Sequence, residues 1–217
     1  MHDIKFSGYS VFFDFDNTIT AIDILDDIIE RFSENRDWEA YEKSWKAGRI
    51  GSRECLKGQL KSVRITKKGL LRYLSMVKID PYFKKVLAAL KERKIKPVIL
   101  SDNFSFIIKN ILKNNDITGL TVYSNSLRFR KDRIIPSFPH ALPSCLRCGN
   151  CKKSSLSKNN FRDKIIYIGD GLSDVCAAKE ADIVFGKDSL LEHFRKIKKD
   201  CIPFKDLRQV YNYFNGD

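Results

Sequence analysis

The chain has 217 residues, of which 43% are hydrophobic and 31% charged; this composition excludes a disordered or low-complexity chain and suits one compact core with at most a small inserted module. No apolar run approaches the roughly 18–20 residues that span a bilayer, and no secretory signal is present, so we expect a cytoplasmic protein without a membrane partner. The net charge of +13 attracts anions such as nucleic acids or phosphorylated metabolites, but a lysine-rich solvated surface explains it equally well.

Short apolar runs alternate with helical patterns along most of the chain. In chain order we expect a strand over Tyr9–Phe13, a helix over Pro81–Lys94, a strand over Pro97–Leu100, a helix over Phe104–Lys113, a strand over Leu120–Tyr123, a hairpin-like segment over Ser126–Pro136, an irregular Pro/Ser/Cys-rich segment over Ser137–Ser155, a strand over Ile165–Ile168, a helix over Asp174–Glu180, a strand over Asp182–Phe185 and a helix over Leu190–Lys198. This alternation predicts an α/β fold with a Rossmann-like parallel sheet and helices on both faces.

One long insert interrupts the alternation directly after the first strand. It holds no convincing strand, only the helix-like segments Asp23–Phe32, Trp38–Lys46 and Ser52–Leu60. We therefore expect residues 1–20 and 80–217 to form the α/β core. Residues 21–79 would form a small helical cap over any site carried by the first strand.

Three of the expected strands end in polar residues. They are followed by Asp14-Phe15-Asp16-Asn17-Thr18, by Ser101-Asp102-Asn103 and by Gly169-Asp170-Gly171-Leu172-Ser173-Asp174. Because ligands of open parallel sheets bind at the carboxyl ends of the strands, we expect these side chains to converge on one site. Carboxylates gathered there need a compensating charge, and Mg²⁺ prefers carboxylate, water and phosphate oxygens. The sequence thus predicts a Mg²⁺ site.

In order and spacing, these segments resemble motifs one, two and four of the haloacid dehalogenase (HAD) superfamily, and the insert resembles the C1 cap of its phosphoserine phosphatase-like members. The resemblance covers essentially the whole chain. It implies a phosphoric monoester hydrolase that acts on a small phosphorylated metabolite, with Mg²⁺ as cofactor and an aspartyl-phosphate intermediate.

The resemblance also implies a role for each matching carboxylate. Asp14 would attack phosphorus, and Asp16 would first protonate the leaving oxygen and then activate water. Asp14, Asp170 and the main-chain carbonyl of Asp16 would hold Mg²⁺. Asp174 would bind the ion through water or orient the other ligands.

Phosphate would be held by Ser101, by the backbone amide of Asp102 and by a motif-three lysine. The candidates for that lysine are Lys152, Lys153, Lys158 and Lys164. We expect Lys152, because a lysine follows a cysteine cluster in the subgroup that this chain resembles. Lys164 begins a strand and should lie at the wrong end of the sheet.

That subgroup comprises the methionine-salvage 2-hydroxy-3-keto-5-methylthiopentenyl-1-phosphate phosphatases and their relatives that act on phosphocholine and phosphoethanolamine. The similar residues are Pro139-His140, Cys145-Leu-Arg-Cys148-Gly-Asn-Cys151-Lys152 and, in the cap, Trp45, Gly48, Ser52 and Glu54-Cys55-Leu56. This weaker similarity does not transfer a substrate.

Cys145, Cys148 and Cys151 have the spacing of metal ligands, with His140 as the nearest fourth ligand of a structural Zn²⁺ site. The alternative, a loop of free thiols in a reducing cytosol, is favoured because the fourth ligand is not fixed.

Asp23, just past motif one, either contacts substrate or caps the helix that follows it, and capping is favoured.

Two other functions suit the basic composition: a phosphatase of nucleic-acid ends and a non-catalytic RNA-binding module. A cap over the site disfavours a polymer, and the intact set of catalytic residues disfavours an inactive module, so we expect no nucleic-acid partner.

Overall fold

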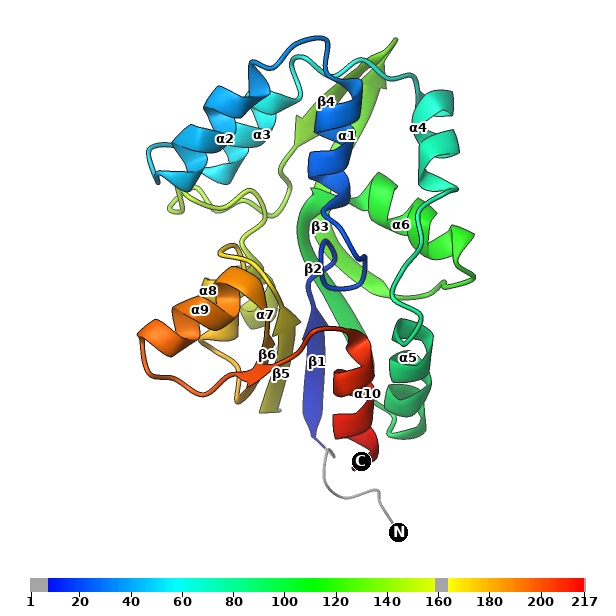
Figure 1. Ribbon diagram of the computed structural model, residues 1–217, viewed down its shortest axis with the longest axis vertical. Helices are drawn as coiled ribbons and strands as arrows, with labels where there is room; N and C mark the ends of the chain where they lie inside the picture. The colour runs from blue at the N-terminus through cyan, green and yellow to red at the C-terminus, as the bar shows by residue number, and fades with distance from the viewer. Residues whose placement is uncertain (1–7, 159–163, 217) are drawn as a thin grey trace.

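The computed structural model describes residues 8–158 and 164–216. At its centre lies a sheet of seven strands in the order β4-β3-β2-β1-β5-β6-β7 (Figure 1). The strands are β1 (Tyr9–Phe13), β2 (Pro97–Phe104), β3 (Thr121–Arg130), β4 (Arg133–Ser137), β5 (Lys164–Gly169), β6 (Ile183–Gly186) and β7 (Ile202–Pro203). Neighbouring strands pair in parallel except β3 and β4, which form an antiparallel hairpin. The predicted α/β fold is confirmed.

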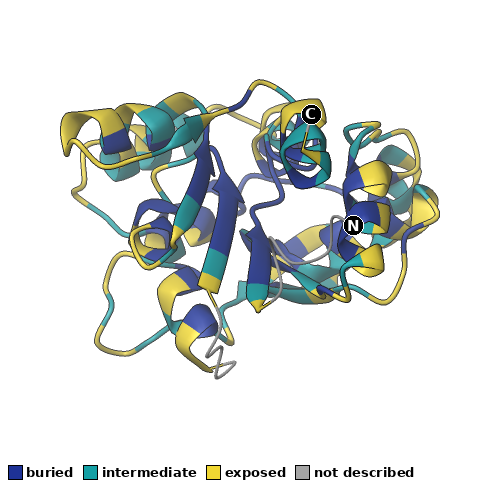
Figure 2. Cartoon of the chain, turned by 90° about the horizontal axis from the view of Figure 1, so that it is seen from below, coloured by how far each residue is buried: buried dark blue, intermediate teal, exposed yellow. Residues whose placement is uncertain are grey.

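Different helices cover the two faces of the sheet. Phe13, Ile99 and Ile168 belong to the apolar cluster that includes α5 (Phe83–Glu92), α6 (Ser105–Asn114) and α10 (Leu207–Asn215). Phe12, Leu100 and Tyr167 belong to the cluster that includes α7 (Lys152–Lys158), α8 (Val175–Ala178) and α9 (Asp188–Lys196). Successive strand residues point to opposite faces, so one apolar run can fill both layers. Figure 2 shows the resulting pattern, with buried strands between helices whose outer surfaces are exposed.

The insert after β1 carries α1 (Ile24–Phe32), α2 (Trp38–Lys46), α3 (Ser52–Gln59) and α4 (Lys67–Leu74). Its two ends lie side by side, because Thr20 and Ile79 form an antiparallel bridge and the Asp80 amide donates to the Ile19 carbonyl at 2.8 Å. In Figure 1, α1, α2 and α3 lie beyond the carboxyl end of β1. We propose residues 21–79 as the cap, and the pairing of its ends supports this division. Residues 1–7, 159–163 and 217 of the expected core lie outside the described residues.

The cap is also bonded to the core away from its ends. The Ile65 amide donates to the carbonyl of Asp132, in the turn between β3 and β4, at 2.7 Å. Residues 145–151, which we call the cysteine loop, bind the start of α3: the Ser52 amide donates to the Arg147 carbonyl at 2.7 Å, and the Arg53 guanidinium donates to the Cys145 carbonyl at 2.6 Å. The cap therefore contacts the core on three sides.

The elements differ from the predicted ones mainly near the candidate site. Strand β2 runs on through Ser101-Asp102-Asn103 to Phe104, where the sequence predicts a helix start, and its register with β3 shifts between Leu100 and Phe104. The Pro/Ser/Cys-rich segment ends in a helix, α7, rather than an irregular chain. No helix within the described ranges has the length and apolarity needed to cross a bilayer.

Candidate active site

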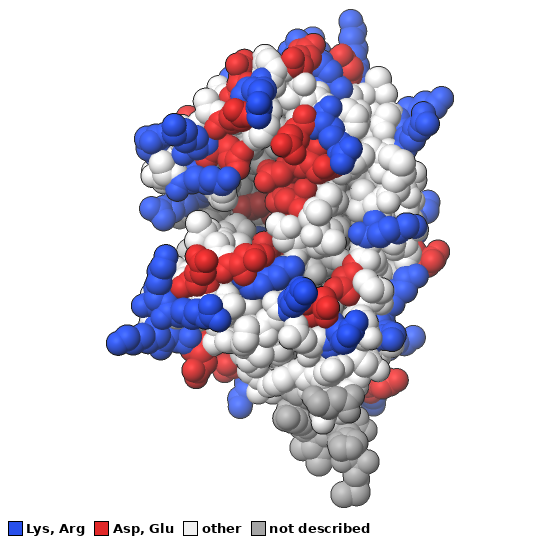
Figure 3. Space-filling view, viewed as in Figure 1, with Lys and Arg blue, Asp and Glu red and all other residues white. Residues whose placement is uncertain are grey.

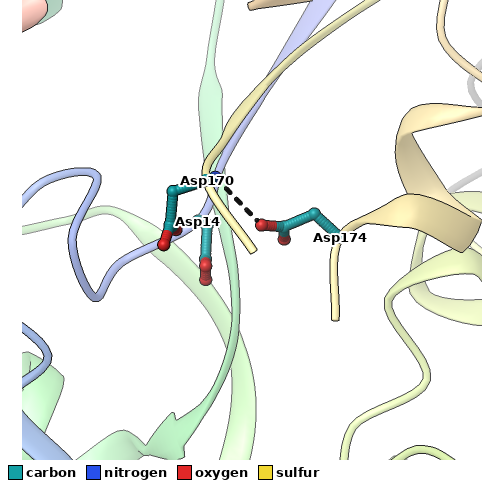
Figure 4. Close-up of side chains that lie close together, drawn as sticks. All are labelled: Asp14, Asp170 and Asp174. Atoms are coloured by element: carbon teal, nitrogen blue, oxygen red, sulfur yellow. Dashed lines mark hydrogen bonds between the residues drawn. The ribbon is translucent and has the colours of Figure 1, made fainter. Parts of the chain in front are cut away.

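Three aspartates gather at the carboxyl end of the sheet. Asp14 follows β1, Asp170 follows β5, and Asp174 precedes α8. One oxygen of each carboxylate lies within 4.8 Å of the others, and no other group of three acidic, histidine or cysteine ligands of this kind occurs in the part of the chain that the structure describes. Figure 4 shows the Asp14 and Asp170 carboxylates side by side, with Asp174 reaching toward the main chain of Asp170. The predicted convergence of the strand ends is present.

A tight turn after Asp14 shapes the site. The amides of Ile19 and Thr20 both donate to the Phe15 carbonyl, at 2.8 and 3.1 Å. Asn17 has a φ of 53° in this turn, in the left-handed region that asparagine tolerates better than most side chains. The turn brings the Thr18 hydroxyl to donate to Asp170 Oδ1 at 3.2 Å, which links the ends of β1 and β5.

Asp16 is held apart from the three aspartates. Its Oδ1 accepts hydrogen bonds from the Ile24 amide and from Asn103 Nδ2, and its Oδ2 accepts a bond from Asn103 Nδ2, each at 3.0 Å. Burial and the charge of Asp23 raise the pKa of Asp16 well above its usual value. A raised pKa keeps a carboxyl group protonated nearer neutral pH, as a general acid requires. Asn103 has this anchoring role without having been singled out in the sequence.

Lys152 lies between two of the aspartates. It starts α7 with its side chain 2% exposed, and its Nζ is 2.8 Å from Asp14 Oδ1 and 2.6 Å from Asp174 Oδ1. Burial alone would lower the pKa of Lys152, but the charges of Asp14 and Asp174 outweigh it and raise that pKa. The other candidate lysines are exposed and lie elsewhere: Lys153, Lys158 and Lys164. The structure thus places Lys152, and none of the other three, in the site.

The aspartate cluster has an excess of negative charge that a divalent cation would neutralise. Three carboxylates against one ammonium group leave two negative charges uncompensated. Burial and the charge of Asp174 accordingly raise the pKa of Asp14, and they raise that of Asp170 to about 6. An ion of charge +2 with a preference for hard oxygen ligands fits this set, and Mg²⁺ has both properties.

Asp174 is less available to a metal than the other two aspartates. Its Oδ1 accepts bonds from Lys152 and from the Tyr167 hydroxyl, and its Oδ2 accepts bonds from the amides of Asp170 and Gly171. All four donor atoms lie within 3.2 Å of the Asp174 oxygen that accepts from them. This geometry suits the orienting role better than direct coordination.

Ser101 and Asp102 have different surroundings although both line the cavity. Ser101 Oγ accepts from the Asn103 amide at 3.0 Å, which leaves its hydroxyl hydrogen free to donate. The Asp102 side chain instead accepts from the Asn150 amide at 2.7 Å. Asn150 Nδ2 donates to the Ser101 carbonyl at 3.0 Å, so it fastens the segment before Lys152 to β2. Nothing in the sequence distinguished Asn150.

A cavity of about 440 Å³ opens over these residues. Its floor comes from the core. Its cap wall is lined by acidic, apolar and polar residues and one lysine: Asp23, Leu25, Asp26, Glu42, Trp45, Lys46, Ser52, Cys55, Leu56 and Gln59. Asp23 accepts from the Asp26 amide at 2.9 Å, which confirms the predicted capping of α1, and it lines the cavity as well. Figure 3 shows acidic side chains gathered in the upper middle of this face, near α1, with Lys and Arg side chains on either side of them.

The cysteine loop does not assemble the zinc ligands that its spacing suggests. Sulfur atoms of Cys145, Cys148 and Cys151 and the nitrogens of His140 do not form a group of three within 4.8 Å. The His140 ring packs edge-on against Tyr123, with the ring centroids 5.5 Å apart, and the His140 carbonyl accepts from the Cys151 amide at 3.2 Å. The loop is bonded instead to the cap, through the carbonyls of Cys145 and Arg147, and to β2, through Asn150.

Comparisons with known proteins agree with this geometry. Residues 9–200 match the model of a family described as "Putative Phosphatase". Among curated relatives, the 2-hydroxy-3-keto-5-methylthiopentenyl-1-phosphate phosphatase of Geobacillus kaustophilus is 30% identical over 199 residues, covering 89% of this chain and 90% of that protein. The protein of the same name from Geobacillus thermodenitrificans is 29% identical over 209 residues, covering 94% of each.

Solved structures share the fold at low identity. A phosphoserine phosphohydrolase-like protein from Francisella tularensis superposes with a TM-score of 0.73 at 16% identity, covering 94% of this chain and 99% of that one. A phospho-aspartyl intermediate analogue of phosphoserine phosphatase gives a TM-score of 0.72 at 18% identity, covering 95% and 98%. The family match, the relatives and the shared fold lead to one conclusion: this chain belongs to the Putative Phosphatase family and is a HAD phosphatase, a phosphoric monoester hydrolase.

Proposed function

We propose that this phosphatase is Mg²⁺-dependent and hydrolyses the monoester of a small metabolite through a phosphorylated Asp14. The observation that carries the proposal is the contact of buried Lys152 with Asp14, 2.8 Å apart, beside Asp170 at the floor of the cavity. The Lys152 ammonium group fixes the orientation of the Asp14 carboxylate. Because Asp14 lines the cavity, a bound phosphoryl group can reach its oxygen.

Mg²⁺ would be held by Asp14, Asp170 and the main-chain carbonyl of Asp16. When bound, the ion would neutralise charge on the phosphoryl oxygens. The uncompensated charge of the aspartate cluster and its all-oxygen donor set support this assignment.

The side chains divide the reaction between them. Asp14 attacks phosphorus while Lys152 and the Ser101 hydroxyl stabilise negative charge on the phosphoryl oxygens. Asp16, whose raised pKa favours the protonated form, donates its proton to the leaving oxygen. Its Oδ2 accepts a single hydrogen bond from Asn103, which leaves that oxygen room to carry the proton. The resulting carboxylate then takes a proton from the water that hydrolyses the intermediate.

Removal of divalent metal should abolish turnover. We expect hydrolysis of an aryl phosphate with added Mg²⁺, complete loss with a chelator and full recovery when Mg²⁺ is restored, measured by phosphate release. Rapid acid quenching followed by mass spectrometry should find one phosphoryl group on the peptide that contains Asp14. Metal-independent turnover, or phosphate on another peptide, would refute the mechanism.

The cap wall supports a proposal about the leaving group. Asp23, Asp26 and Glu42 place three carboxylates along this wall, while its one lysine, Lys46, forms an ion pair with Glu42. Trp45 lines the same wall, and aromatic rings attract cations. We infer that the site favours leaving groups with a positive charge, such as the ammonium group of phosphoethanolamine. The substrate named for the curated relatives has hydroxyl, keto and methylthio groups and no amine.

A matched pair of substrates tests this preference. Phosphoethanolamine and 2-hydroxyethyl phosphate differ only in an ammonium group against a hydroxyl group, so the ratio of their kcat/KM values isolates the effect of the charge. We expect a ratio above one in the wild type. A ratio at or below one would favour an uncharged leaving group, as in the substrate of the curated relatives.

Asp26 gives that preference a pH dependence. Partial desolvation at the cavity wall and the charges of Asp23 and Glu42 raise the pKa of Asp26, whose outer side is exposed, to about 7. The substrate ratio should therefore rise from pH 6 to pH 8, as Asp26 loses its proton, and Asp26→Asn should lower it by about two- to fivefold at pH 8. Because a raised carboxyl pKa favours folding only at low pH, Asp26→Asn should also raise the melting temperature more at pH 8 than at pH 5. Glu30→Gln, on the same helix but outside the cavity and the smallest of the charges that act on Asp26, is the matched control and should change both quantities much less.

A further inference from the structure

The fixed orientation of Asp174 depends on a residue outside the cavity. Asp174 is fully buried, and the oxygen that pairs with Lys152 also accepts a hydrogen bond from the Tyr167 hydroxyl, each at 2.6 Å. The second oxygen is held by the amides of Asp170 and Gly171, at 3.2 and 3.0 Å. Lys152 is in turn 2.8 Å from Asp14. A continuous chain of polar contacts thus runs from Tyr167 through Asp174 and Lys152 to Asp14.

Tyr167 occupies a position that a purely apolar side chain could fill. It lies in β5 with none of its surface exposed, among the apolar residues beneath α7, α8 and α9. Phenylalanine would fill the same volume, so the hydroxyl group needs a separate explanation. A buried hydroxyl is costly without a partner, and here its partner is the Asp174 carboxylate.

The backbone of β5 is shaped to admit this carboxylate. A Cβ atom on Gly169 would lie 2.6 Å from Asp174 Oδ2, closer than real contacts allow. It would also lie 3.0 Å from the Tyr167 ring. Glycine at this position therefore lets the carboxylate and the phenol meet directly behind the site.

We propose that Tyr167 is a positioning residue for phosphoryl transfer: its hydroxyl fixes the Asp174 oxygen that directs Lys152 at Asp14. The inference rests on the proposed function and deepens it. Tyr167 does not line the cavity and so touches neither substrate nor metal. Its effect on the reaction passes through two other side chains.

Tyr167→Phe is the direct test, because it removes the hydroxyl and keeps the ring. We expect kcat for an aryl phosphate to fall by about 10- to 100-fold, as for other residues that orient a reacting group, while KM changes by less than about threefold. The matched control is Tyr73→Phe, which removes a hydroxyl that donates to Asp27 at 2.5 Å, in a pair that does not line the cavity. That control should keep the wild-type kcat, and the two variants should have similar melting temperatures.

A double substitution separates positioning from general loosening of the core. If Tyr167 acts through Asp174, then Tyr167→Phe should lower kcat no further when Asp174→Asn is already present. An equal fall in both backgrounds, or an undiminished kcat in Tyr167→Phe alone, would overturn the positioning role and leave the proposed function intact. Absence of turnover by the wild type with any phosphate monoester would overturn the proposed function and this role together.

Discussion

Asp14→Asn should abolish phosphate-monoester hydrolysis without weakening the fold. An amide cannot attack phosphorus, so we expect kcat to fall by more than about 10⁴-fold. Asp14 is one of three buried carboxylates whose mutual repulsion contributes to its raised pKa. Removing its charge relieves that repulsion, so the free energy of unfolding should be unchanged or higher. Aryl phosphate hydrolysis and thermal melting measure the two effects on the same preparation.

Asp16→Asn is the informative comparison for this variant. An aryl phosphate has a good leaving group that needs no proton, so Asp14 should still be phosphorylated, but the intermediate should persist because no base activates water. Asp14→Asn should give no phosphorylated enzyme and Asp16→Asn should accumulate it. Hydrolysis by Asp14→Asn within tenfold of the wild-type rate, after mass spectrometry has excluded deamidation back to aspartate, would contradict the assignment of the nucleophile.

Lys152→Met should have the largest effect on stability. The side chain is 2% exposed and its ammonium group contacts two buried carboxylates. Breaking such a buried pair from one side costs about 3–5 kcal/mol of unfolding free energy, because the carboxylates keep their charge without a partner. Activity should fall by about 10²–10³-fold, since the developing phosphoryl charge loses a fixed cation.

The loss of stability in Lys152→Met should depend on pH and on metal. The unpaired carboxylates take up protons more readily in the folded than in the unfolded state, so the loss should shrink as pH falls from 8 to 5 and shrink again when Mg²⁺ is added. Urea unfolding at both pH values measures this. Lys153→Met is the control: its exposed ammonium group pairs with Glu180, and its removal should leave the free energy of unfolding nearly unchanged. Equal losses for the two variants would show that Lys152 has no special electrostatic role.

The sequence predicts the fold well where periodicity is clear. Strand β1 and helix α2 have the predicted bounds, since a β-branched and aromatic run and an amphipathic run are strong local patterns. The strand predicted to end at Leu100 is shorter than β2, because Ser101-Asp102-Asn103 are poor strand formers; in the structure they form the irregular stretch between the pairs that Leu100 and Phe104 make with β3. Helix α10 was not predicted, although Asp206 and Gln209 form a readable capping box at its start.

The sequence predicts some residues of the candidate site better than others. Asp14, Ser101 and Asp170 each directly follow a predicted strand, so the parallel topology predicted from the sequence brings them together. Lys152 is expected from the resemblance, because a lysine directly follows the cysteine cluster there, and its contacts with Asp14 and Asp174 show how it differs from Lys153. Tyr167 sits inside an apolar strand and reads there as a core residue, because sequence does not reveal what a buried hydroxyl group faces.

The three-sided attachment of the cap has a consequence for how substrates enter. Rotation of the cap away from the core would break the hydrogen bonds from Ile65 to Asp132 and from Ser52 and Arg53 to the cysteine loop. We therefore expect substrates to enter through the mouth of the cavity while these bonds stay intact, and compact phosphate esters to enter more readily than the ends of polymers.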